Sequence, residues 1–157
     1  MDTDVLAKAI KGVLETVPGI GVVHDAPQYT KSTAQWLKMM TPEGSKEVNG
    51  WCVTGPGSSP VEGAGLTNVD ARYDHSFLIV GVHEINEASM AAFRTMISNI
   101  LITLIKNQTL GTLCIPNNHL PEATEIDEIP NDEDIKHPTF YHTVGIGFTV
   151  TSRTIIT

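Results

Sequence analysis

The sequence has few cysteines, no long apolar run and an acidic start. Its two cysteines, Cys52 and Cys114, lie between apolar neighbours. This is typical of buried reduced thiols, although a bridge between them stays an open alternative. No apolar run approaches the ~20 residues of a membrane span, and the start MDTDVLAKAI is acidic where a signal peptide is basic. We therefore expect a soluble protein of cytoplasmic origin with no membrane partner.

Basic residues are also few. The 157 residues include 10 Lys and Arg against 18 Asp and Glu, which gives a formal net charge of -8. Such a protein repels phosphate backbones and anionic membranes at long range, which excludes general nucleic-acid binding. With 41% hydrophobic residues, the chain can build one core without disulfides or a metal, so we expect a single domain over residues 1–157.

A first amphipathic helix is predicted near the N-terminus. Apolar residues from Val5 to Val17 recur at helical spacing, Asp4 is the expected N-cap, and Pro18 with Gly19 ends the helix.

A second and longer helix is predicted from an N-cap at Asn86 to Lys106. Its main apolar stripe places three residues in the core, namely Phe93, Ile97 and Leu101. Ile102 and Ile105 lie outside or at the edge of that stripe, so either the sheet wraps around the helix or a second subunit contacts it.

Strands are predicted in four places. Residues 33–40 and 46–55 form a hairpin in this interpretation, with Trp36 and Trp51 on its two strands. Phe77 to Val82 is a nearly continuous apolar run, as in a buried central strand. The closing stretch HTVGIGFTVTSRT alternates between an apolar face and a face of Gly, Thr and Arg153, which is either solvated or covered by another protein.

Together these segments predict the α+β class, with a mainly antiparallel twisted sheet of about four to five strands and two helices packed on it. Two long loops are predicted, at residues 55–70 and 117–138. The second is densely acidic and is expected to be solvated and mobile. The interface or channel candidates are Glu122, Glu125, Asp127, Glu128, Asp132, Glu133, Asp134, Thr149, Thr151 and Arg153.

The sequence gives little sign of catalytic chemistry. On one strand, His75 and His83 would lie ~27 Å apart, too far to share a metal ion. His24 with Asp25, or Cys52 with a histidine, would be needed for acid–base or nucleophilic chemistry, but neither has a local signature. His119 and His137 flank the acidic loop, yet its carboxylates lack the spacing of a calcium loop. We predict no catalytic residues, no metal and no cofactor.

The order of elements resembles the tail terminator and related head–tail joining proteins of long-tailed bacteriophages. The segments that carry the resemblance are VLAKAIKGVLETVPGIG, YDHSFLIVGVHEINEASMAAFRTMISNILITLI and HTVGIGFTVTSRT. The resemblance implies an α+β domain without catalytic residues, which forms a homo-oligomeric ring, commonly of six copies, in the neck of the virion tail. Its implied partners are the tail tube protein and the head-completion or connector protein, and DNA passes through the lumen without specific binding.

Other functions remain open from the sequence. The chain could be another neck, tube or head-completion component, or a small cytosolic enzyme. The acidic residues could face the DNA channel, dock on a basic patch of the head connector, or form a solvated surface.

Overall fold

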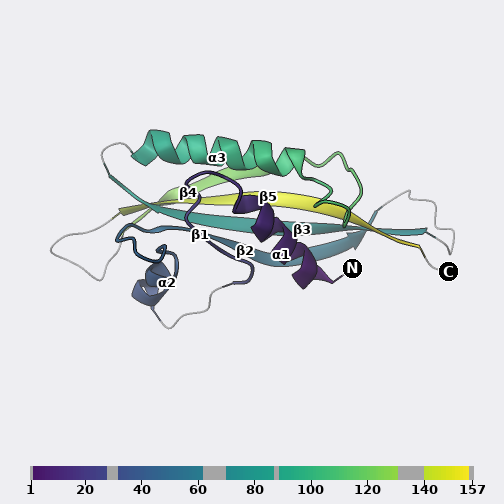
Figure 1. Cartoon of the computed structure of the whole chain (residues 1–157), viewed down its shortest axis with the longest axis horizontal. Coiled ribbons are helices and arrows are strands. Elements are labelled where there is room, and N and C mark those ends of the chain that lie inside the picture. Colours follow the sequence, from purple (N-terminus) through teal and green to yellow (C-terminus); the bar gives the residue numbers. More distant parts are fainter. Residues whose placement is uncertain (1, 28–31, 62–69, 87–88, 131–139, 156–157) are drawn as a thin grey trace.

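A computed structural model describes residues 2–27, 32–61, 70–86, 89–130 and 140–155, without the side chains of residues 56, 70, 125–130 and 140. In this part of the chain, five strands form one sheet in the order β1-β2-β3-β5-β4, and three helices pack on it (Figure 1). The elements are α1 (Thr3–Leu14), β1 (Val22–His24), α2 (Thr33–Met39), β2 (Asn49–Pro60), β3 (Asp70–Glu84), α3 (Ser89–Lys106), β4 (Glu122–Pro130) and β5 (Phe140–Ile155). The α+β class is confirmed.

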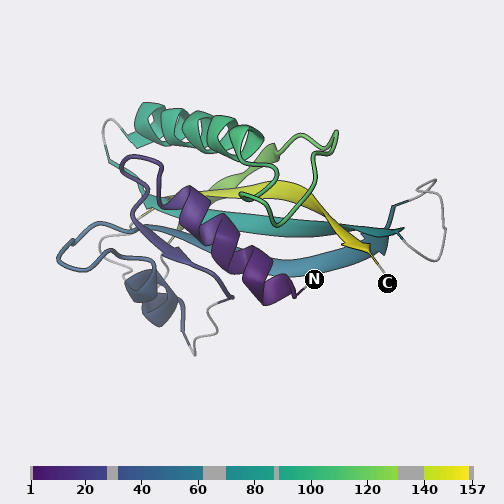
Figure 2. The ribbon, with the colours of Figure 1, turned by 45° about the vertical axis from the view of Figure 1, so that its right-hand side comes forward.

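The main core lies between one face of the sheet and the helices α1 and α3. β3 and β5 pair antiparallel over their full length, with Phe77 opposite Phe148 and Ile79 opposite Ile146, and all four are buried. Figure 2 shows α1 and α3 on this side of the sheet and α2 on the other. The apolar face predicted for the closing strand is thus confirmed as a core face.

The N-cap of α1 lies two residues earlier than predicted. Asp2 is the N-cap, because its side chain accepts a hydrogen bond from the Asp4 backbone N–H at 2.9 Å. Asp4 therefore lies in the first turn, where a carboxylate also favours the helix dipole. The helix buries Leu6, Ala7, Ile10 and Leu14 against the sheet.

α3 packs on the sheet as predicted, with Phe93 and Ile97 buried, whereas Leu101 is only partly buried at the edge of the core. Phe93 stacks on Trp51 with ring centroids 6.3 Å apart. Trp51 in turn covers Gly81 of β3, since a Cβ built at Gly81 would lie 2.3 Å from the indole ring. A side chain at position 81 would therefore push the indole out of the core.

The predicted hairpin of residues 33–40 and 46–55 is wrong, because the first of these segments is the helix α2. Ser32 caps it by accepting from the Gln35 backbone N–H, and Leu37 and Met40 bury one face against Val82 on the second face of the sheet. β1 and β2 are parallel, so they need a crossover, and α2 lies in it. This parallel pair is the departure from the mainly antiparallel sheet that the sequence predicted.

The two segments predicted as long loops, residues 55–70 and 117–138, each contain part of a strand. Residues 55–60 continue β2, after a register shift between Thr54 and Gly57. Residues 122–130 form β4, which pairs antiparallel with β5, so the acidic segment begins as an edge strand and not as a free loop.

Candidate functional site

Beyond α2, no other described helix covers the second face of the sheet, and we call this part the open face. It consists of Thr54, Ser76, Leu78, Glu122, Thr124, Gly147 and Thr149, all exposed or partly exposed. Leu78 is directly opposite Gly147 in the pairing of β3 with β5, and 44% of its surface is exposed. The open face is thus apolar at Leu78 and Gly147, and the exposed Glu122 lies opposite Gly147 on β4.

Hydrogen bonds hold the side chains of the open face close to the sheet. The Thr54 hydroxyl donates to the Leu78 carbonyl at 2.9 Å, and the hydroxyls of Ser76 and Thr149 are 3.2 Å apart. A Cβ built at Gly147 would have only the Glu122 carbonyl oxygen within 4 Å, at 3.9 Å. Packing inside the described chain therefore does not require a glycine at position 147, although close approach of another molecule would.

The Gly and Thr face of β5, predicted to be solvated or covered by another protein, is buried by the chain itself at two positions. Thr143 is buried opposite Val82, which packs against α2, and Thr151 is buried where its hydroxyl donates to Asp74 Oδ1 at 2.6 Å. Thr149 is partly exposed on the open face, and Arg153 is exposed near the end of β5. Of the candidates on this strand, only Thr149 thus belongs to the open face.

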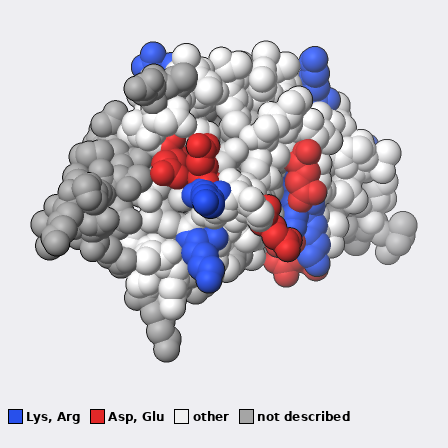
Figure 3. Space-filling model, turned by 60° about the vertical axis from the view of Figure 1, so that its left-hand side comes forward, with Lys and Arg blue, Asp and Glu red and all other residues white. Residues whose placement is uncertain are grey.

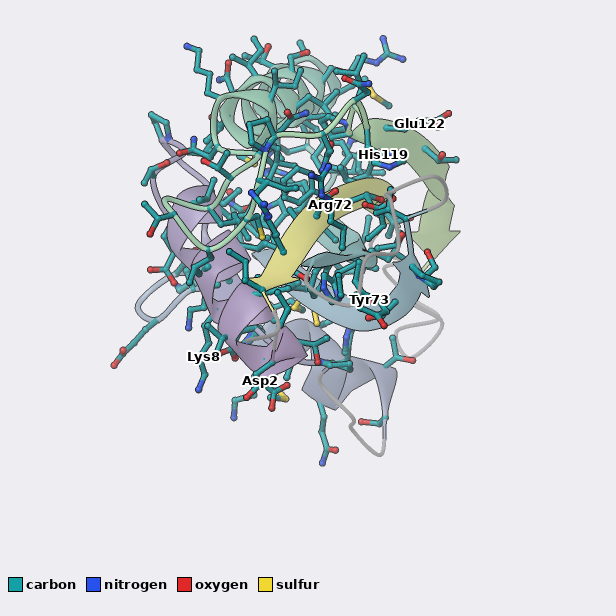
Figure 4. The ribbon with its side chains drawn as sticks, turned by 90° about the vertical axis from the view of Figure 1, so that its right-hand side faces the viewer. Asp2, Lys8, Arg72, Tyr73, His119 and Glu122 are labelled. Carbon is teal, nitrogen blue, oxygen red and sulfur yellow. The ribbon has the colours of Figure 1, made fainter. Side chains whose placement is uncertain are left out.

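The structure describes only some of the acidic candidate residues. Glu122 is exposed at the start of β4 (Figure 4), and it pairs with Gly147 of β5, so it lies on the open face. Glu125, Asp127 and Glu128 lie in β4, where only the backbone is described. Asp132, Glu133, Asp134 and His137 lie outside the described residues.

A second candidate surface is the outer face of α3, formed by Ala91, Thr95, Ser98, Ile102 and Ile105. These exposed residues are spaced alternately four and three apart, which is the spacing of residues that face a packing partner. Ile102 and Ile105 are 51% and 46% exposed. The charged residues of α3 are Arg94 and Lys106. In Figure 3, the top of the molecule, where α3 lies in Figure 1, is largely uncharged between basic groups at its two ends.

A buried cluster of three polar side chains that the sequence did not predict lies in the first half of β3. The His75 ring is buried, with Nδ1 2.8 Å from the Ser58 hydroxyl and Nε2 2.8 Å from the Ser152 hydroxyl. A hydroxyl can donate or accept, so either neutral tautomer of His75 is satisfied. No sequence signal could have found this contact, because Ser152 lies 77 residues from His75.

His75 and Ser152 do not have the surroundings of a catalytic pair. The neighbouring carboxylate, Asp74, points to the other face of the sheet, where it contacts His119 Nε2 at 2.9 Å and accepts from Thr151. His75 and Ser152 are 4% and 2% exposed, so a substrate could not reach them without opening the sheet. The arrangement satisfies buried polar groups and holds the end of the sheet together.

Burial lowers the pKa of His75 from its usual value of 6.5, and Asp74 partly opposes this shift. As the pH falls through 6.5, the unfolded chain takes up a proton at this ring while the folded chain does not. Acid therefore lowers the free energy of unfolding by at most about 1.4 kcal/mol for each pH unit below the usual pKa.

We expect the His75→Gln variant to lose less stability than the wild-type protein when the pH is lowered from about 7.5 to about 5.5. Urea unfolding at the two pH values measures this difference. Equal losses in the two proteins would show that His75 does not contribute to acid sensitivity.

Both cysteines are buried and neither is in a disulfide, and burial raises the pKa of the Cys114 thiol to about 11. Among the described residues, no three His, Cys, Asp or Glu side chains gather in a way that could hold a metal ion. No helix in the described part of the chain is long and apolar enough to cross a membrane.

No protein-family model matches the chain, and no curated protein matches its sequence. The function must therefore be inferred from the surfaces described above.

Proposed function

We propose that this chain is a structural virion protein of the tail-terminator class. Copies of it form a ring, which caps the tail tube and joins it to the head connector. The proposal joins the resemblance in element order to two surfaces of the folded chain that expose large apolar side chains, the open face with Leu78 and the outer face of α3 with Ile102 and Ile105.

The observation that carries the proposal is the pair of Leu78 and Gly147 at the centre of the open face. An exposed leucine beside a glycine that internal packing does not require fits a surface against which a neighbouring subunit lies. The carboxylate of Glu122 borders this surface on β4, opposite Gly147, so a neighbouring subunit must leave it solvated or pair it with a cation.

A closed ring needs two different surfaces on each copy, because its contacts are head-to-tail. The outer face of α3 and the open face lie on opposite sides of the sheet (Figure 1). In the proposed ring, Ile102 and Ile105 of one copy pack on Leu78 and the flat surface around Gly147 of the next copy.

The charge of the chain fits a ring through which DNA passes. A formal net charge of -8 disfavours binding of phosphates, so DNA would cross the lumen without specific contacts.

The proposal is tested by adding the gold-labelled protein to tail tubes assembled from purified tube protein. The expected electron micrographs show label at one end of each tube. Label along the tube walls, or no label, would contradict the terminator function. Label on isolated head connectors, with bare tubes, would favour the alternative of a head-completion protein.

A further inference from the structure

Each of the two surfaces that meet in the proposed ring has a charged side chain beside its exposed apolar residues. On the open face this is Glu122, which is exposed at the start of β4 and pairs with Gly147 of β5. Beside the outer face of α3 it is Lys106, which is exposed in the last turn of the helix. The two side chains carry opposite charges.

Neither Glu122 nor Lys106 has a hydrogen bond or an ion pair within the described part of the chain. Paired residues on neighbouring strands share a face of the sheet, so Glu122 points to the same side as Gly147. α3 packs on the other side (Figure 1). The sheet therefore separates the two charged groups within one chain, and each of them is available to a neighbouring copy.

Lys106 is the basic residue of α3 that lies nearest to the proposed contact. It follows Ile105 directly and lies one helical turn after Ile102. The other basic residue of the helix, Arg94, is about 18 Å away along the helix axis, at 1.5 Å per residue. Docking of Ile102 and Ile105 on the open face would thus bring Lys106, and not Arg94, to the same place.

Glu122 lies within reach of a lysine at that place. Leu78, Gly147 and Glu122 form one row across three neighbouring strands, β3, β5 and β4. Strands are about 4.8 Å apart, so the row is about 10 Å long. A turn of helix above Leu78 and Gly147 covers about half of this length, and the four-carbon stem of Lys106 covers the rest.

We propose that Lys106 of one copy forms an ion pair with Glu122 of the next copy, and that this pair fixes the register of the subunit contact. The inference rests on the proposed ring. Copies with a net charge of -8 repel one another at long range, and a pair of opposite charges at the contact offsets part of this repulsion. An exposed ion pair adds little affinity, but it disfavours contacts in which either charge meets a like charge.

A charge swap tests the pair. Glu122→Lys alone, or Lys106→Glu alone, places two like charges in each contact and should weaken association of the copies about tenfold. The double variant restores opposite charges and should associate within about threefold of the wild-type protein. Light scattering over a concentration series measures association.

Two features of this experiment separate the ion pair from a loss of structure. If Lys106→Glu only weakened the end of α3, adding Glu122→Lys would not restore association. The control Lys8→Glu reverses an exposed charge on α1, outside both surfaces, and should associate like the wild-type protein.

Chemical cross-linking tests the contact in the wild-type protein. A carbodiimide joins a carboxylate to an amine where the two groups are in contact. In a mixture of isotopically light and heavy copies, we expect a linked peptide pair in which Lys106 comes from one kind of copy and Glu122 from the other. Mass spectrometry identifies such mixed pairs.

The outcomes distinguish the ion pair from the ring itself. The ion pair would be wrong, and the ring would stand, if the wild-type protein assembled but the single reversals changed nothing, the double variant stayed dissociated, or no mixed peptide pair formed. A wild-type protein that stays single at every concentration would contradict both the ring and the pair.

Discussion

The Ile97→Asp variant should fail to fold into soluble protein. Ile97 is 7% exposed and packs in the core between α3 and the sheet. An aspartate there would be an unpaired charge in an apolar site, at a cost of several kcal/mol. Domains of this size have a total stability of about 5–15 kcal/mol, so most of the folded population would be lost. Soluble yield and the thermal unfolding midpoint measure the effect.

Asn99 provides the control, because it is exposed on the same helix and lies outside the outer face of α3. Asn99→Asp introduces the same charge and should unfold within a few degrees of the wild-type protein. If Ile97→Asp also gave normal yield and a normal unfolding midpoint, the placement of α3 on the sheet would be wrong.

Replacing both Ile102 and Ile105 by lysine should dissociate the proposed ring while leaving the subunit folded. The two isoleucines are about half exposed in the single chain, so they contribute little to its core. Their burial in a subunit contact would contribute about 3 kcal/mol, and their loss would weaken each contact roughly a hundredfold. Light scattering over a concentration series measures the assembly, and circular dichroism measures the fold.

Val5→Lys is the control for this variant. Val5 is 42% exposed on α1, so the substitution adds a charge at an exposed apolar residue outside both proposed surfaces. It should assemble like the wild-type protein. Normal assembly of the Ile102→Lys and Ile105→Lys double variant would exclude the outer face of α3 as a ring contact.

Alternation and helical spacing predicted the parts of the fold in which one face is strongly apolar. The faces of β3 and β5, the position of α3 and the exposure of Ile102 and Ile105 all follow from such patterns. The segment of α2 is short, and its apolar residues suit a strand as well as a helix. There the cap at Ser32 and the burial of Leu37 and Met40 decide the structure.

The edge strand β4 was missed because its charge density is typical of a solvated loop. Charged residues are also typical of edge strands, since charge discourages pairing with other chains, so the same composition fits both structures.

The open face could be predicted only in part. Alternation in the closing strand indicates which residues share a face, but it does not show what covers them. The covering groups come from distant segments, namely α2 over Val82, the strand partner of Thr143, and Asp74 with His119 beside Thr151. The central pair of Leu78 and Gly147 depends on the register between β3 and β5, which no local pattern determines.

The most direct test of the proposed function is the mass of the purified wild-type protein, measured by native mass spectrometry together with negative-stain electron microscopy. The chain has a mass of 17.0 kDa. We predict a closed ring with a fixed number of copies, and the resemblance to tail terminators favours six, or about 100 kDa. A single-copy mass at every concentration, also when tube protein is present, would contradict the proposal.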